Sequence, residues 1–134
     1  MLRTTTRILI VDDYEPWRRF IRLTLLANEK LQVIGEVSGG LEAVHRVQEL
    51  KPDLILLDIG LPELNGIEAA RRIREASPNS KILFVSENRT GDIAEEALST
   101  GASGYIVKSA AAGELLPAER AVLVSKANGS PAPV

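Results

Sequence analysis

Cysteine is absent from this sequence of 134 residues, and histidine occurs only once. The lack of cysteine excludes disulfides, thiolate metal ligands and a thiol nucleophile, and it fits a reducing compartment. Long apolar runs are missing as well. The first one, Ile8–Val11, ends at two aspartates and is too short for a signal peptide or a membrane span. We therefore expect a cytoplasmic protein that does not enter a membrane.

A large excess of charge of either sign is also lacking. The formal net charge is -2, which gives no bulk attraction to nucleic acid or to an anionic membrane, so we expect no direct nucleic-acid contact. The glycine patterns that cradle nucleotide phosphates do not occur either. With 45% hydrophobic and 25% charged residues, the composition is that of one soluble globular domain.

What the sequence does contain is a set of four short apolar runs, each followed by a characteristic polar group. Buried parallel strands read as such runs, and ligands bind beyond the carboxyl ends of strands in open α/β sheets. We therefore expect three carboxylates, a hydroxyl and an ammonium at one edge of one sheet. The pairs of run and polar group are Ile8–Val11 with Asp12 and Asp13, Leu54–Leu57 with Asp58, Ile82–Val85 with Ser86, and Tyr105–Val107 with Lys108.

Strand and helix patterns alternate five times along the chain. This alternation predicts an α/β fold, a doubly wound five-stranded parallel sheet of order 2-1-3-4-5, as in flavodoxin-like proteins. Residues 1–126 are expected to form one domain, and residues 127–134 have the composition of a flexible tail or a linker. The expected strands are Ile8–Val11, Leu31–Val37, Asp53–Asp58, Lys81–Ser86 and Gly104–Val107, and the expected helices are Glu15–Ala27, Leu41–Leu50, Ile67–Ala76, Asp92–Thr100 and Ala110–Lys126.

Three carboxylates at one sheet edge repel one another. Two of them about 5 Å apart repel by about 3 kcal/mol at an effective dielectric near 20. Either one carboxyl keeps its proton, with a raised pKa, or a divalent cation binds. Because the available ligands are oxygens, the cation would be Mg²⁺ or Mn²⁺.

Four segments in combination resemble the receiver domain of bacterial response regulators, over about residues 7–126. They are the acidic pair Asp12-Asp13, the segment LLDIGLPELNGIEAARRIR around Asp58, Ser86 after the fourth strand, and GASGYIVKS around Lys108. The last two segments are most similar to the subfamily that often carries a C-terminal helix-turn-helix. These 134 residues do not include such a module.

The resemblance implies a phosphoacceptor domain of a two-component system that catalyses only its own phosphorylation and dephosphorylation. Asp58 would take the phosphoryl group from a histidine kinase or a phosphotransfer protein. Asp13, Asp58 and the backbone carbonyl of Gly60 would bind Mg²⁺ directly. Asp12 would reach the metal through water.

The remaining implied roles concern the phosphorylated state. Lys108 would pair with one phosphoryl oxygen, and Ser86 would hydrogen-bond another. Tyr105 would move inward as Ser86 moves. A wide apolar stripe on the fifth helix is our expected surface for a homodimer or another partner.

Three positions depart from the receiver pattern. Glu87 stands where a small residue is usual, so its charge is expected to repel the phosphoryl donor and to slow phosphorylation. Ser109, the expected N-cap of the fifth helix, stands where many receivers have a cis proline; a cis bond before serine would cost about 2.5–4 kcal/mol. Pro117 lies inside the fifth helix and predicts a bend there.

Two other functions stay open at this stage. The first is an interaction module of the same fold that works without phosphate. The second is a small-molecule phosphatase, which would want an Asp-x-Asp motif after the first strand, whereas Asp12 and Asp13 are adjacent. His45 is interpreted as a bystander on the second helix, and Trp17 as a packing residue, with a partner contact as the lesser alternative.

Overall fold

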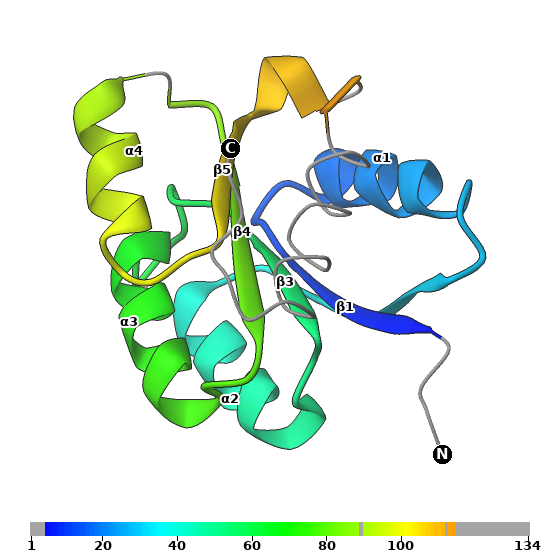
Figure 1. The fold of residues 1–134 in the computed structure, drawn as a ribbon, viewed down its shortest axis with the longest axis horizontal. Helices are drawn as coiled ribbons and strands as arrows, with labels where there is room; N and C mark the ends of the chain where they lie inside the picture. Colours follow the sequence, from blue (N-terminus) through cyan, green and yellow to red (C-terminus); the bar gives the residue numbers. More distant parts are fainter. Residues whose placement is uncertain (1–4, 89, 112, 115–134) are drawn as a thin grey trace.

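A computed structural model describes residues 5–88, 90–111 and 113–114. They form five strands and four helices that alternate along the chain, followed by a short 3-10 turn (Figure 1). The strands are β1 (Thr6–Val11), β2 (Leu31–Val37), β3 (Leu54–Leu57), β4 (Lys81–Ser86) and β5 (Gly104–Val107), the helices are α1 (Glu15–Leu25), α2 (Gly40–Leu50), α3 (Gly66–Ala76) and α4 (Gly91–Leu98), and the 3-10 turn η1 spans Lys108–Ala110.

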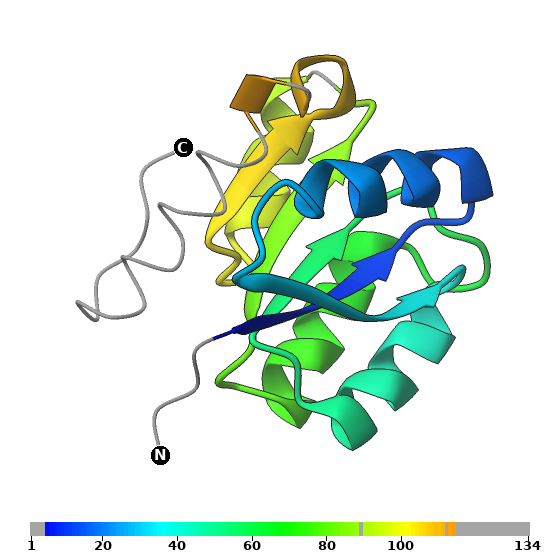
Figure 2. The ribbon, with the colours of Figure 1, turned by 90° about the vertical axis from the view of Figure 1, so that its right-hand side faces the viewer.

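The five strands form one parallel sheet in the order β2-β1-β3-β4-β5. This confirms the predicted fold class and strand order. All strands run in the same direction, so their carboxyl ends meet at one edge of the sheet (Figure 2). The strand order reverses between β1 and β3, which places the loops after these two strands at the switch point of the sheet.

Helices cover both faces of the sheet, with α1 on one face and α2, α3 and α4 on the other (Figure 1). Successive strand residues therefore bury their side chains on opposite faces: Leu9 and Leu57 pack against α2, α3 and α4, whereas Ile10 and Leu56 pack on the α1 side. Each fully buried Leu or Ile contributes about 1.5–3 kcal/mol. Burial on both faces explains why β1, β3 and β4 contain continuous apolar runs rather than alternating patterns, whereas the edge strand β2 is only partly buried.

Several helix ends differ from the expected ones by one or two residues. Helix α1 ends at Leu25 instead of Ala27, because the chain tightens there: the Ala27 N–H donates to the Thr24 carbonyl, a 3-10 type bond. Helix α3 begins at Gly66, and Asn65 caps it by accepting bonds from two backbone N–H groups. Such ends are set by local hydrogen bonds that hydrophobic periodicity does not report.

The segment after β5 was expected to begin a helix at Ala110 with Ser109 as its N-cap. In the structure Ser109 lies inside η1, and the helix that it would cap is almost wholly outside the described residues, so the N-cap assignment stays a prediction. No cis peptide bond occurs in the described part of the chain, and the bond between Lys108 and Ser109 is trans. Nearly all of the expected fifth helix lies outside the described residues, together with Pro117, the expected dimer surface and the tail 127–134. Within the described ranges, no helix has the length and apolar character that a membrane crossing requires.

Candidate functional site

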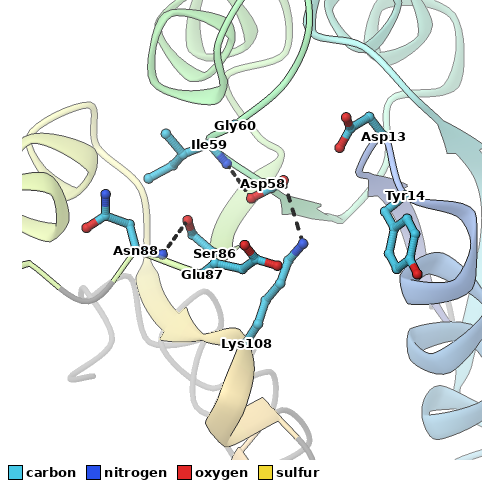
Figure 3. Close-up of a pocket in the computed structure, with 9 residues that line it drawn as sticks. All are labelled: Asp13, Tyr14, Asp58, Ile59, Gly60, Ser86, Glu87, Asn88 and Lys108. Carbon is cyan, nitrogen blue, oxygen red and sulfur yellow. Dashed lines mark hydrogen bonds and ion pairs between the residues drawn. The ribbon is translucent and has the colours of Figure 1, made fainter.

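An open pocket of about 430 Å³ lies at the carboxyl edge of the sheet. The loops after β1, β3, β4 and β5 surround it, so that residues far apart in the sequence meet there (Figure 3). The pocket is lined by Asp13, Tyr14, Asp58, Ile59, Gly60, Ser86, Glu87, Asn88 and Lys108. The structure therefore brings Asp13, Asp58, Ser86 and Lys108 together at this edge.

Asp58 is held firmly at the end of β3 and is 7% exposed. Its backbone N–H donates to the Val11 carbonyl at 3.0 Å, which extends the β1–β3 ladder by one bond, and the Ile59 N–H donates to Asp58 Oδ1 at 2.9 Å. The start of α3 packs tightly behind it, since a Cβ on Gly66 would lie 2.0 Å from the Asp58 carbonyl oxygen. Glycine at position 66 is thus required by the backbone that positions Asp58.

Asp12, Asp13 and Asp58 each offer a carboxylate oxygen, and these oxygens lie within 4.8 Å of one another. Asp12 is 2% exposed, whereas Asp13 is exposed and faces the pocket. Asp12 Oδ1 accepts a bond from the Tyr14 N–H at 2.8 Å, and the guanidinium of Arg18 donates to the Asp12 carbonyl at 2.6 Å. Hydrogen bonds from the start of α1 therefore hold the acidic loop in place.

The carboxyl of Asp58 is the acid of this cluster whose pKa is raised. Burial, together with the neighbouring charge of Asp12, raises the pKa of the Asp58 carboxyl from 3.8 to about 6. Lys108 and the backbone N–H groups of Ile59 and Gly60 act in the opposite direction, and their sum is smaller. A positive ion at this point would relieve the repulsion that raises the pKa.

Lys108 points back into the site from the end of β5 (Figure 3). The ladder pairs Leu57 with Phe84 and Phe84 with Tyr105, and Asp58 follows Leu57 directly, whereas Lys108 comes three residues after Tyr105. Lys108 thus starts about 7 Å farther along the strands than Asp58. Only a long side chain can span that offset, which explains why a lysine serves there.

The ammonium of Lys108 lies closer to Asp12 than to Asp58. Its Nζ is 2.6 Å from Asp12 Oδ2 and 3.7 Å from Asp58 Oδ2, and the lysine side chain is 12% exposed. Asp12 Oδ2 accepts no hydrogen bond from any residue that the structure describes, so the contact is an ion pair held by charge. Asp12 is therefore the resting partner of Lys108 and does not itself line the pocket.

Ser86 and Tyr105 are linked through the loop after β4. The buried Ser86 Oγ accepts a bond from the Asn88 N–H at 3.2 Å, and the Tyr105 hydroxyl donates to the Asn88 carbonyl at 2.7 Å. Tyr105 is only 8% exposed and its ring packs near Phe84. The ring thus already occupies an inward position, and an outward position would be the alternative state.

Sequence reasoning missed part of the site. Tyr14, Ile59 and Asn88 line the pocket, and their signal was only their place directly after the predicted strand ends. Trp17 packs against the α1 side of the core as expected, and its ring also faces Lys108 at 5.0 Å. His45 has an exposed side chain on α2, 4.0 Å from Glu49, and it does not line the pocket.

The fold and the site together define a class of protein: a doubly wound α/β domain with a carboxylate cluster and a lysine at the switch point of its sheet. The chain belongs to the response regulator receiver domain family, whose sequence pattern matches residues 8–119. It is thus a receiver domain of two-component signalling, and the resemblance noted from the sequence is confirmed. Receiver domains bind Mg²⁺ through such an acidic pocket and interact with histidine kinases or phosphotransfer proteins.

Individual relatives support this assignment. The chain is 34% identical to the response regulator GacA of Pseudomonas viridiflava over 125 residues, which are 93% of this chain and 58% of GacA. It is 39% identical to the chemotaxis protein CheY of Thermotoga maritima over 102 residues, or 76% of this chain and 84% of CheY. The chain therefore spans little more than half the length of GacA.

Solved structures agree with the sequence relatives. The response regulator domain of Thermotoga maritima CheB superposes with a TM-score of 0.79 at 34% identity, covering 87% of this chain and 94% of the CheB domain. A LuxR-family two-component response regulator from Aurantimonas sp. SI85-9A1 superposes with a TM-score of 0.85 at 32% identity, covering 96% and 89% of the two chains.

Proposed function

We propose that this chain is a phosphoacceptor: Asp58 takes a phosphoryl group from a phosphohistidine on a histidine kinase or a phosphotransfer protein, and the pocket then changes conformation. The main support is the environment of Asp58. It is a buried carboxylate that opens on a pocket, with an ammonium 3.7 Å away and two further carboxylates in the same cluster. We assign the exchange to the cytoplasm, in line with the absence of cysteine.

In the proposed transfer, an oxygen of the Asp58 carboxylate forms a bond to phosphorus. The N–P bond of the phosphohistidine breaks, and its electron pair stays on the imidazole nitrogen. Negative charge is spread over the phosphoryl oxygens in the transition state, so fixed positive charge beside them lowers the barrier. Lys108 supplies such a charge. Attack of water on the acyl phosphate then returns the carboxylate and inorganic phosphate, and the chain has no other substrate.

The residues at the pocket fit a magnesium ion. Asp13 and Asp58 would bind it through carboxylate oxygens, Gly60 through its backbone carbonyl, and Asp12 through water. When bound, the ion would neutralise charge on the transferred oxygens. The fit rests on three carboxylate oxygens within 4.8 Å and on the charge of Asp12, which adds to burial in raising the pKa of Asp58 and which a cation would offset. Mn²⁺ would use the same ligands.

The switch would involve the loop after β4. Phosphorylation adds about two negative charges at the end of β3. Ser86 would then turn its hydroxyl toward a phosphoryl oxygen and give up the bond from the Asn88 N–H. Since Tyr105 is bonded to the carbonyl of that same Asn88, its position would change with the loop.

We take residues 1–126 as the functional unit and residues 127–134 as a tail or linker. A homodimer through the fifth helix belongs to this proposal, and its residues lie outside those described. An interaction module that works without phosphate remains the second candidate, because the exposed carboxylate of Glu87 lies at the mouth of the pocket (Figure 3).

The test uses acetyl phosphate with Mg²⁺ and intact-protein mass. We expect the chain to gain one phosphoryl group, Asp58→Asn to gain none, and a chelator to abolish the reaction. Asp92→Asn, an exposed aspartate on α4, is the matched control and should react like the parent. If the parent chain takes no phosphoryl group and beryllofluoride leaves the Trp17 emission unchanged, the phosphoacceptor proposal is wrong. Turnover of p-nitrophenyl phosphate would then favour a phosphatase, and its absence would favour the interaction module.

A further inference from the structure

The ammonium of Lys108 has a third neighbour besides the two aspartates. Its Nζ lies 5.0 Å from the centroid of the Trp17 ring. An ammonium within about 6 Å of an indole face is attracted by the negative face of the ring. The lysine charge thus has two carboxylates and one aromatic face as its neighbours.

Trp17 is itself held in place by the loop that carries the acids. Its backbone N–H donates to the Tyr14 carbonyl at 3.1 Å, and the backbone N–H of Tyr14 donates to Asp12 Oδ1 at 2.8 Å. Its ring also packs against Phe20, with 5.1 Å between ring centroids, and against the core on the α1 side of the sheet. The half-buried indole therefore forms a wall beside the ammonium that packs on Phe20 and on the core.

We propose that Trp17 is a positioning residue that keeps Lys108 in the pocket and thereby sets the rate at which Asp58 is phosphorylated. This inference rests on the proposed phosphoacceptor function. A lysine side chain has several rotatable bonds and a strongly hydrated head group, so without a wall it samples many rotamers in water. The ring removes part of that freedom and excludes water from one side of the ammonium.

An aromatic wall suits the movement that the reaction requires of Lys108. At rest, the ammonium is 2.6 Å from Asp12 Oδ2 and 3.7 Å from Asp58 Oδ2. A phosphoryl group on Asp58 would draw the ammonium away from Asp12. The attraction of an indole face has no single hydrogen-bond direction, so the lysine can shift along the ring without losing it. A hydrogen-bonding neighbour in the place of Trp17 would instead hold the lysine at one point.

The test compares Trp17→Leu, Trp17→Phe and Phe20→Leu, each alone and combined with Lys108→Gln. With acetyl phosphate and saturating Mg²⁺, we expect Trp17→Leu to slow phosphorylation by about three- to thirtyfold, which is the range that a cation–π contact spans. Trp17→Phe should recover most of the rate, because it keeps an aromatic face. Phe20→Leu removes the other ring of α1 and should change the rate by less than about twofold.

The double variants separate positioning from a general effect on packing. If Trp17 acts through Lys108, then Trp17→Leu should have no further effect on the rate in the Lys108→Gln background. An equal slowing in both backgrounds would overturn the proposal. So would a Trp17→Leu rate equal to that of the parent, or a Phe20→Leu rate as low as that of Trp17→Leu.

A second readout needs no phosphoryl transfer. The ε-protons of Lys108 should show an upfield ring-current shift in the NMR spectrum of the parent, and this shift should vanish in Trp17→Leu and persist in Phe20→Leu. If the parent shows the ring-current shift but takes no phosphoryl group, the phosphoacceptor function is wrong and the contact between Trp17 and Lys108 is established. An unshifted Lys108 in a parent that reacts normally would refute the positioning role alone.

Discussion

The two sides of the pocket are built differently. The paired side is formed by Lys108, with Asp12 and Trp17 behind it; Asp12 is buried, Trp17 and Lys108 are half-buried, and the charges of Asp12 and Lys108 lie in direct contact. The open side, made of Gly60, Glu87 and Asn88, is exposed to solvent. Charges in contact away from water carry large energies, whereas exposed charges are screened. The paired side therefore fixes the geometry of the site, and the open side controls access to it.

Lys108→Met is the variant that should disturb the paired side most strongly. This change leaves Asp12 with a buried charge and no ammonium beside it, and removal of one partner of a buried pair destabilises a protein by about 3–5 kcal/mol. Glu87→Gln on the open side is the control and should change the free energy of unfolding by less than about 0.5 kcal/mol. Urea unfolding at pH 7 measures both. Equal effects of the two variants would mean that the two sides do not differ.

Asp58→Asn should stabilise the metal-free protein at neutral pH. The pKa of Asp58 is about 6 in the folded chain, against 3.8 for the ordinary carboxyl, so the folded state binds the proton more tightly. The stabilisation from the protonated form is therefore complete below about pH 3.8 and is lost as the pH rises through about 6. About two pH units correspond to about 3 kcal/mol, which is the gain that we expect for Asp58→Asn at pH 7.5.

The pH dependence provides the control for this prediction. In a chelator, the difference in unfolding free energy between Asp58→Asn and the parent should shrink steadily from pH 7.5 to pH 4. Saturating Mg²⁺ should reduce it at pH 7.5, because an ion that binds only the folded parent stabilises that parent. A difference that stays constant over this pH range would show that ionisation of Asp58 does not destabilise the fold.

Arg18→Met tests how α1 supports the paired side. The Arg18 guanidinium donates to the Asp12 carbonyl at 2.6 Å and to Glu36 Oε1 at 3.1 Å. Its removal should lower the free energy of unfolding by about 1.5–3 kcal/mol and weaken Mg²⁺ binding, since the acidic loop loses a fixed donor. Arg19→Met is the matched control, because Arg19 is exposed and forms a loose ion pair with Glu15 at 3.9 Å. Such a pair is worth about 0.5 kcal/mol or less. Thermal unfolding and a magnesium titration measure the two effects.

The sequence predicted those features of the fold and the site that depend on a pattern within one short segment. Short apolar runs located β4 and β5 to the residue, because most of their side chains are buried, and polar residues at strand ends located Asp58, Ser86 and Lys108. The order of strands followed from the alternation of strand and helix.

Contacts that depend on how elements pack could not be read in the same way. Lys108 lies nearer to Asp12 than to Asp58, although the two acids follow paired residues of β1 and β3, and no pattern within one segment reports that difference. The contact between the Trp17 ring and Lys108 likewise depends on how α1 packs against the sheet, and no pattern within one segment predicts it. The bond from the Tyr105 hydroxyl to the Asn88 carbonyl involves a backbone atom, which residue identity alone does not single out.

The smallest effect is expected for Glu87→Gln on the rate of phosphorylation. Glu87 lines the mouth of the pocket, and its carboxylate repels an incoming anionic phosphodonor. Because the side chain is exposed, the repulsion is modest and screened, so we expect Glu87→Gln to speed the reaction with acetyl phosphate by about two- to fivefold at low salt. The gain should disappear near 1 M salt, where the Debye length is about 3 Å. Glu95→Gln, an exposed glutamate on α4 outside the pocket, should leave the rate unchanged; a gain of equal size there would mean that net charge, and not access to the open side, sets the rate.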